Sequence, residues 1–155
     1  LNLPPAALYV SSSGATGAGV ALGAKLVGFD CPVRLICPMP WPWHIPTAIA
    51  RDASAAAELM GLPHRLAAAD VDADESYIPP GYGLPSAAGQ EALHLLARTE
   101  AILLDPVYSA KAMAALVADV RSGTFAPGSA VVFIHTGGVP AVFADPAGVL
   151  ARPPA

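Results

Sequence analysis

One stretch near the start of the chain, residues 6–28, constrains the fold more than any other. It begins with a short apolar run that ends at Ser11, which is typical of a strand buried on both faces. Small residues follow at 11–16 (SSSGAT), and then a run of Ala, Leu, Val and Gly predicts a helix over 17–28. A buried strand that passes through a small-residue loop into a helix is the repeating unit of parallel α/β sheets.

The rest of the chain continues this alternation. Apolar runs and helical spacing predict further strands at 33–37, 102–104 and 130–134, and helices at 47–60, 86–99 and 109–122, with a last helical turn at 140–144. The segment 67–85 is rich in loop-forming residues, and its acids at 70–75 indicate a solvated loop. We therefore expect a layered α/β domain with a parallel sheet.

The serine-glycine loop has the composition of a phosphate-binding loop. The first N–H groups of a helix lack intrahelical partners, and the helix dipole favours an anion there. Glycine and alanine allow close approach of the backbone, and serine and threonine hydroxyls add donors. No Lys-Ser or Lys-Thr pair follows, so it is not a Walker loop, and its glycine spacing does not fit a dinucleotide fingerprint. A tight strand-to-helix turn with a capping serine remains the alternative.

Composition narrows the class of protein. Hydrophobic residues make up 54% of the 155-residue chain and charged residues only 13%, so either the surface is alanine-rich and weakly polar or another chain or segment covers part of it. The net charge of −4 without a basic stripe argues against nucleic acid as a partner. No apolar run reaches the roughly 18–20 residues of a membrane span. Two sparse cysteines and no basic leader predict a cytoplasmic protein, and a start at Leu1 rather than Met suggests that the chain begins within a gene.

Three further motifs follow the serine loop in order: GYGLP at 81–85, LDPVYSAKAM at 104–113 and FIHTGGVPA at 133–141. Together they resemble the D-cysteine desulfhydrase and 1-aminocyclopropane-1-carboxylate (ACC) deaminase family of pyridoxal 5′-phosphate (PLP) enzymes. The resemblance runs from Ala6 to about Phe143. It implies the C-terminal portion of a three-layer, parallel-sheet PLP fold type II, with residues 1–150 mainly in the large cofactor-binding domain and 151–155 as a tail.

The resemblance also implies roles for single residues. Those matching the cofactor-binding positions are Ser13, Gly14, Ala15 and Thr16 around the phosphate and Thr136 beside the pyridine nitrogen. Tyr82 matches a catalytic tyrosine near the substrate. A hydroxyl at Thr136 does not hold the pyridine nitrogen protonated, which suits β-elimination. We therefore expect D-cysteine desulfhydrase activity first, with ACC deaminase and a non-catalytic phosphate-binding module as alternatives.

The lysine that carries the cofactor in such enzymes has no match here. The chain has two lysines, Lys25 and Lys111, and neither falls at the family's position. The resemblance places that lysine in an N-terminal half, which is then the first expected partner. The chain alone is expected to be inactive. A small D-amino acid or related substrate and a homodimeric parent enzyme are the other expected partners, and no metal is expected.

Four other residues are candidates for the site or its surroundings. His135 follows a predicted strand beside Thr136, and a structural role satisfied by the backbone is the favoured interpretation. We expect Trp41 and Trp43 to pack on a partner or on the missing half. Asp105, which precedes a proline, is interpreted as a turn or capping residue.

Overall fold

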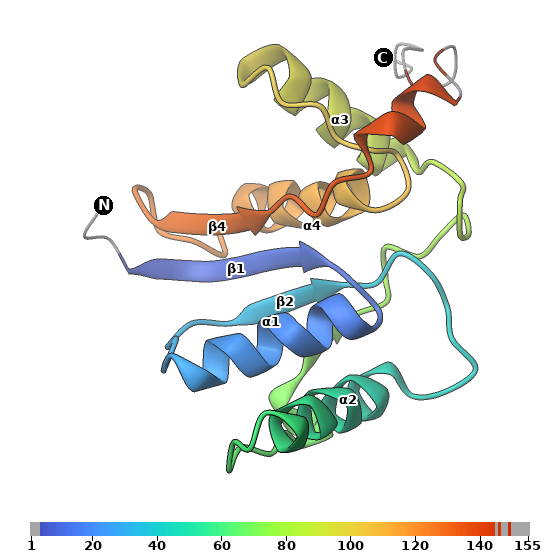
Figure 1. The fold of residues 1–155 in the computed structure, drawn as a ribbon. Coiled ribbons are helices and arrows are strands. Elements are labelled where there is room, and N and C mark those ends of the chain that lie inside the picture. The colour runs from blue at the N-terminus through green and yellow to red at the C-terminus, as the bar shows by residue number, and fades with distance from the viewer. Residues whose placement is uncertain (1–3, 145, 147–148, 150–155) are drawn as a thin grey trace.

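A computed structural model describes residues 4–144, 146 and 149, and it shows a parallel sheet of four strands in the order β3-β2-β1-β4. The strands are β1 (Pro5–Ser11), β2 (Val33–Ile36), β3 (Asp72–Asp74) and β4 (Ala130–Ile134). The chain therefore builds the sheet outward from β1 on one side and adds β4 on the other side last (Figure 1).

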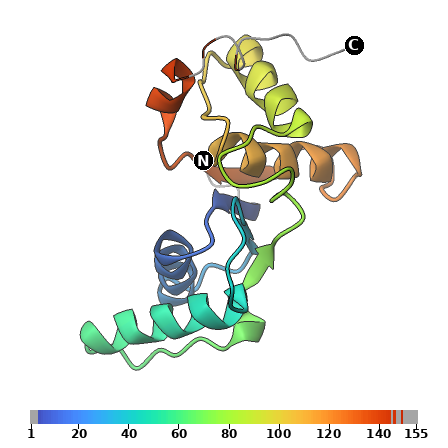
Figure 2. The ribbon, with the colours of Figure 1, turned by 90° about the vertical axis from the view of Figure 1, so that its right-hand side faces the viewer.

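Helices cover both faces of this sheet. They are α1 (Ala15–Leu26), α2 (Ile45–Leu59), α3 (Ala87–Thr99) and α4 (Ser109–Arg121), with short 3-10 helices at Ala68–Asp70 and Val139–Phe143. Helices α1 and α2 lie together on one face, α4 packs on the other, and α3 packs on α4 away from the sheet (Figures 1 and 2). The predicted layered α/β architecture is confirmed.

Strand β1 shows why the sheet is buried on both faces. Leu8 and Val10 pack with α1 and α2, whereas Ala7 and Tyr9 point to the opposite face and pack with α4. All four side chains are buried. Because successive side chains of a strand alternate between faces, a nearly continuous apolar run is what a central parallel strand requires.

Two expectations for regular structure are wrong. The segment interpreted as a solvated loop contains β3, in which Asp72 and Asp74 pair with Arg34 of β2. Conversely, residues 102–104 form no strand, and the side chains of Ile102 and Leu103 are 44% and 46% exposed. Apolar character alone does not create a strand, because a strand also needs a partner strand for its backbone hydrogen bonds, and residues 102–104 pair with none in the described part of the chain.

Other predicted boundaries agree to within a few residues, and β4 has the predicted bounds. The proposed tail at 151–155 lies outside the described residues. Among the helices in the described part of the chain, none is both long enough and apolar enough to cross a membrane.

Candidate functional site

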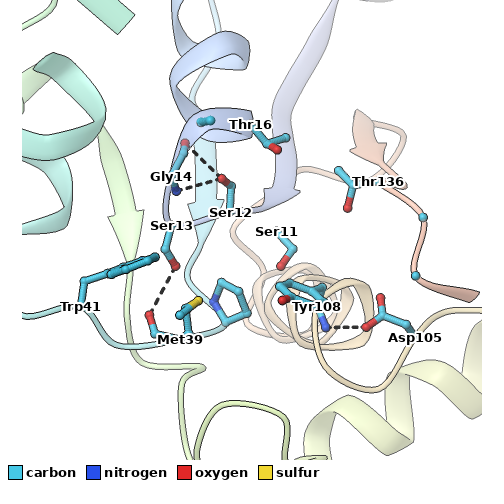
Figure 3. Close-up of a pocket in the computed structure, with 14 residues that line it drawn as sticks. Ser11, Ser12, Ser13, Gly14, Thr16, Met39, Trp41, Asp105, Tyr108 and Thr136 are labelled. Carbon is cyan, nitrogen blue, oxygen red and sulfur yellow. Dashed lines mark hydrogen bonds between the residues drawn. The ribbon is translucent and has the colours of Figure 1, made fainter. Parts of the chain in front are cut away.

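A cavity of about 410 Å³ opens at the edge of the sheet where β1, β2 and β4 end (Figure 3). Its walls come from three loops and the segment before α4: Ser11, Ser12, Ser13, Gly14, Ala15, Thr16, Pro38, Met39, Trp41, Asp105, Tyr108, Thr136, Gly137 and Gly138. Strand β1 has its sequence neighbour β2 on one side and the late strand β4 on the other. Open parallel sheets bind ligands at such a switch point, outside the carboxyl ends of the strands.

Ser12 organises the loop between β1 and α1. Its hydroxyl accepts hydrogen bonds from the backbone N–H groups of Gly14, at 3.2 Å, and Gly17, at 2.8 Å. A β-carbon at position 17 would lie 3.0 Å from Leu35 Cδ1 and 3.1 Å from Ser12 Oγ. Glycine at 17 therefore lets the first turn of α1 pack tightly against β2 and this serine.

The N–H groups of Ala15 and Thr16, also in the first turn of α1, point to no acceptor among the described residues. A β-carbon at Gly14 would meet nothing within 4 Å, so the space beside this turn is open. None of the described residues that line the cavity is basic. An anion here would be held by amide dipoles, the α1 dipole and hydroxyls rather than by a cation.

The loop after β2 forms a second wall. Ser13 donates a hydrogen bond from its hydroxyl to the carbonyl oxygen of Met39, at 3.4 Å, and so connects the serine loop to this segment. Trp41 lines the cavity, and its ring stacks on that of Trp43 with centroids 4.7 Å apart. Packing of both tryptophans on a partner or on the missing half stays a prediction, and the place of Trp41 in the cavity wall is not visible in the sequence.

The third wall follows β4 and contains Thr136. Beside it, His135 Nε2 lies 2.8 Å from the carbonyl oxygen of Leu103, and its Nδ1 accepts a hydrogen bond from Gly137 N–H. Backbone groups thus satisfy both ring nitrogens, as the structural interpretation of His135 predicts. Gly138 adopts a left-handed conformation with φ of +86°.

Asp105 fixes the segment that leads into α4. Its carboxylate accepts hydrogen bonds from the N–H groups of Val107, Tyr108 and Ser109, and from the Ser109 hydroxyl at 2.5 Å. It is the only carboxylate among the described residues that line the cavity, and these bonds occupy it. The predicted turn-forming role is confirmed, and the turn places the Tyr108 side chain on the cavity.

Tyr82, the predicted catalytic tyrosine, does not line the cavity but contacts a residue that does. Its hydroxyl lies 2.5 Å from that of Tyr108, and the two rings meet edge to face. The hydrogen bond with Tyr82, followed by burial, raises the pKa of Tyr108 to about 12. Tyr108 therefore keeps its proton near neutral pH and is a weaker acid than an ordinary tyrosine. Tyr108 belongs to the sequence motif at 104–113, but nothing in that motif marks its side chain as a cavity residue.

Neither lysine reaches the cavity. Lys25 lies at the far end of α1, where its Nζ contacts Asp70 and the carbonyl oxygen of Arg65, each at 3.2 Å. Lys111 is buried in α4 and donates to backbone carbonyls of residues 78 and 81. Their positions agree with the prediction that neither is the cofactor-bearing lysine.

An anion cradle at a helix N-terminus, with hydroxyls and aromatic rings around it, defines a site for a phosphorylated, partly flat ligand in a parallel α/β fold. The profile of the pyridoxal-phosphate dependent enzyme family matches residues 40–137. The chain belongs to this family.

Two relatives share this region. The chain is 42% identical, over 134 residues, to 1-aminocyclopropane-1-carboxylate deaminase of Burkholderia vietnamiensis and 41% identical to that of Burkholderia multivorans. In both cases the match covers 86% of this chain and 40% of the relative. The chain thus spans about 40% of the length of these curated relatives.

A solved structure gives the same result. A crystal structure described as an ACC deaminase homologue superposes with a TM-score of 0.81 at 27% identity, covering 97% of this chain and 45% of that one. The predicted PLP fold type II, as a partial chain, is confirmed, and so is the cofactor of the family.

The residues present fit pyridoxal phosphate. The unpaired N–H groups of Ala15 and Thr16 suit its phosphate, and a cavity of about 410 Å³ falls within the usual range for ligands of this size. Ser11, the first residue of the predicted phosphate-binding loop, lines the cavity, and its buried hydroxyl has no hydrogen-bond partner among the described residues. A buried hydroxyl without a hydrogen-bond partner costs free energy. Such unpaired groups are found where a bound ligand supplies the missing partner.

Proposed function

We propose that this chain forms the phosphate-binding and ring-binding part of a PLP-dependent enzyme that deaminates a small amino acid, with ACC as the first candidate substrate. The observation that carries the proposal is one cavity that joins the serine loop after β1 to Thr136 after β4. Relatives that are 41–42% identical and named ACC deaminases favour this substrate.

In this proposal each wall has its own task. Ser13, Gly14, Ala15 and Thr16 hold the phosphate through N–H groups and hydroxyls. Thr136 supplies a neutral hydroxyl beside the pyridine nitrogen. Bound PLP supplies the electron sink for chemistry at the α-carbon. Tyr82, whose hydroxyl lies 2.5 Å from that of Tyr108 on the cavity wall, transfers a proton or contacts the leaving group of the substrate.

D-cysteine β-elimination, the first expectation from sequence, becomes the second candidate because the relatives favour its alternative. One observation keeps it in consideration: Thr136 lines the cavity. A hydroxyl makes the pyridine ring a weaker electron sink than a carboxylate would, and such a ring suits elimination at the β-carbon.

The test is a product assay with a protein that contains this chain within the full length of its relatives. Water and ACC give 2-oxobutyrate and ammonia, whereas water and D-cysteine give pyruvate, sulfide and ammonia. Turnover of ACC with little sulfide from D-cysteine supports the first candidate, and the opposite preference supports the second. Turnover of neither substrate, in a protein that binds PLP, contradicts both candidates.

We also propose that the 155-residue chain binds PLP without catalysing the reaction, because neither lysine reaches the cavity. The missing lysine would come from the remaining part of the protein, in an enzyme that we expect to be a homodimer. Reduction with borohydride in the presence of PLP should leave no pyridoxyl group on Lys25 or Lys111. Specific labelling of either lysine would overturn this proposal, and binding of phosphate ligands by a full-length protein without activity would favour the phosphate-binding module.

A further inference from the structure

Lys111 is a fully buried cation that the proposed reaction does not use. It lies in the first turn of α4, and its Nζ donates hydrogen bonds to the carbonyl oxygens of Ile78, at 2.7 Å, and Gly81, at 3.1 Å. Burial of an ammonium group is costly unless hydrogen bonds compensate for the lost water. These two bonds connect α4 to a loop far away in the sequence.

That loop carries Tyr82. The carbonyl oxygen of Gly81 also accepts a hydrogen bond from Leu84 N–H, at 3.4 Å, and so closes a turn in which Tyr82 is the second residue. The side chains of Tyr82 and Leu84 are 51% and 52% exposed, so packing does little to hold the turn. Lys111 holds the backbone of this turn directly before the tyrosine.

The partner tyrosine is fixed to the same helix. Tyr108 immediately precedes α4, and Asp105 accepts a hydrogen bond from its N–H at 2.7 Å. Both members of the tyrosine pair are therefore located relative to the first turn of α4: Tyr108 through the chain itself, and Tyr82 through the two bonds of Lys111. Their hydroxyls meet at 2.5 Å.

We infer that Lys111 is a positioning residue: by holding the turn 81–84 against the first turn of α4, it sets the contact between the hydroxyls of Tyr82 and Tyr108 beside the cavity. That this contact serves the reaction rests on the proposed function, but the contact itself does not. Lysine suits the task because one nitrogen with three donors reaches two carbonyl oxygens at the end of a long apolar stem. An apolar side chain would leave both oxygens without this donor.

The test is NMR of the 155-residue chain with labelled tyrosine rings. In Lys111→Met, which keeps the length and apolar stem but removes the donors, we expect the ring-to-ring contacts of Tyr82 and Tyr108 to be lost. The pKa of Tyr108 should fall from about 12 toward its ordinary 10.0. Tyr82→Phe should lower the pKa of Tyr108 in the same way, and the double variant should show no further fall.

Lys25→Met is the matched control, because it removes the other lysine and its surface contacts. It should leave both the ring-to-ring contacts and the pKa of Tyr108 unchanged. A folded Lys111→Met with lower stability and an intact tyrosine pair would show a merely structural role and overturn the inference. If Lys111→Met does not fold, Lys111→Gln makes the same prediction, since its donor is one atom too short to reach both carbonyls. Neither the ring-to-ring contacts nor the pKa of Tyr108 requires PLP or turnover to be measured. Failure of the proposed function would therefore be seen separately, in the product assay.

Discussion

The backbone of Gly138 lies directly against the side chain of Asp105. A β-carbon at position 138 would be 2.8 Å from both Cγ and Oδ2 of that aspartate, closer than such atoms approach in proteins. Gly138 belongs to the turn after β4, and Asp105 fixes the segment before α4. Because residue 138 has no side chain, the turn after β4 and the segment before α4 can pack directly against each other. These two segments are the cavity walls that lie farthest in sequence from the serine loop.

This contact predicts that Gly138→Ala is costly. The left-handed backbone, with φ of +86°, adds strain of about 1–3 kcal/mol, and the collision with Asp105 adds to it. Urea unfolding should show the loss of stability, and PLP affinity should fall because the cavity wall moves. Gly128→Ala is the matched control, because φ is +85° there but a β-carbon would meet nothing within 4 Å. Equal losses in both variants would mean that the contact with Asp105 contributes nothing.

The fluorescence of the tryptophan pair should report ligand binding directly. The chain has two tryptophans, of which Trp41 lines the cavity and Trp43 stacks behind it. PLP added to Trp43→Phe should still quench the remaining fluorescence, and Trp41→Phe should lose most of the quenching. Fluorescence titration of the two variants measures this. Stronger quenching in Trp41→Phe than in Trp43→Phe would place the ligand elsewhere.

Cys37 should make stability fall in alkaline solution. Burial raises the pKa of its thiol from the ordinary 9.0 to about 11. Between these two values the unfolded chain has lost a proton that the folded chain keeps, so stability decreases as pH rises, by at most about 1.4 kcal/mol per pH unit from this group. Below pH 9 the contribution is fully present. Urea unfolding at several pH values should therefore give Cys37→Ala a shallower decline than the unmodified chain between pH 9 and 11.

The control for this slope is Cys31→Ala, since Cys31 is less buried and should change the decline less. Thiol labelling of the folded chain provides a second check, with Cys31 reacting before Cys37. Parallel declines for Cys37→Ala and the unmodified chain would show that the thiol is not shielded as the structure indicates.

Asp119 of α4 connects this helix to the sheet. Its carboxylate accepts hydrogen bonds from the hydroxyl of buried Tyr9 and from Arg34 Nη1, the latter at 2.7 Å. Asp119→Asn should cost about 1–3 kcal/mol in urea unfolding, because it weakens a charged bond and disturbs the buried hydroxyl. Glu58→Gln, which breaks the exposed pair with Arg65, should cost less than about 1 kcal/mol. A smaller loss for Asp119→Asn than for Glu58→Gln would contradict the assignment.

The sequence predicted the central part of the fold well because burial on both faces leaves a clear pattern. β1 and β4 are continuous apolar runs, and each is followed by small or polar residues at the sheet edge. β3 was missed because Asp72 and Asp74 have no apolar pattern; their place depends on Arg34, which lies on the neighbouring strand. Residues 102–104 have the composition of a strand but pair with no strand in the described part of the chain.

The site was predicted where the chain itself brings residues together. Ser13, Gly14, Ala15 and Thr16 are consecutive, and they line the cavity with Thr136. Their roles toward PLP remain predictions, as does that of Tyr82. Trp41 and Tyr108 were not identified as lining residues because their place depends on how separate loops pack, and periodicity carries no signal of that. The orphan hydroxyl of Ser11 becomes visible only once its surroundings are known.

The position of β4 has a consequence for how the molecule is made. β1, near the start of the chain, is bordered on one side by a strand that comes close to the end. During synthesis β1 and β2 can leave the ribosome and pair long before β4 exists, so the growing domain has an unfilled edge beside its central strand. Thr136 and Gly138 arrive with that last strand. The cavity wall formed by Thr136 and Gly138 is therefore made last in this segment, well after the serine loop that it faces.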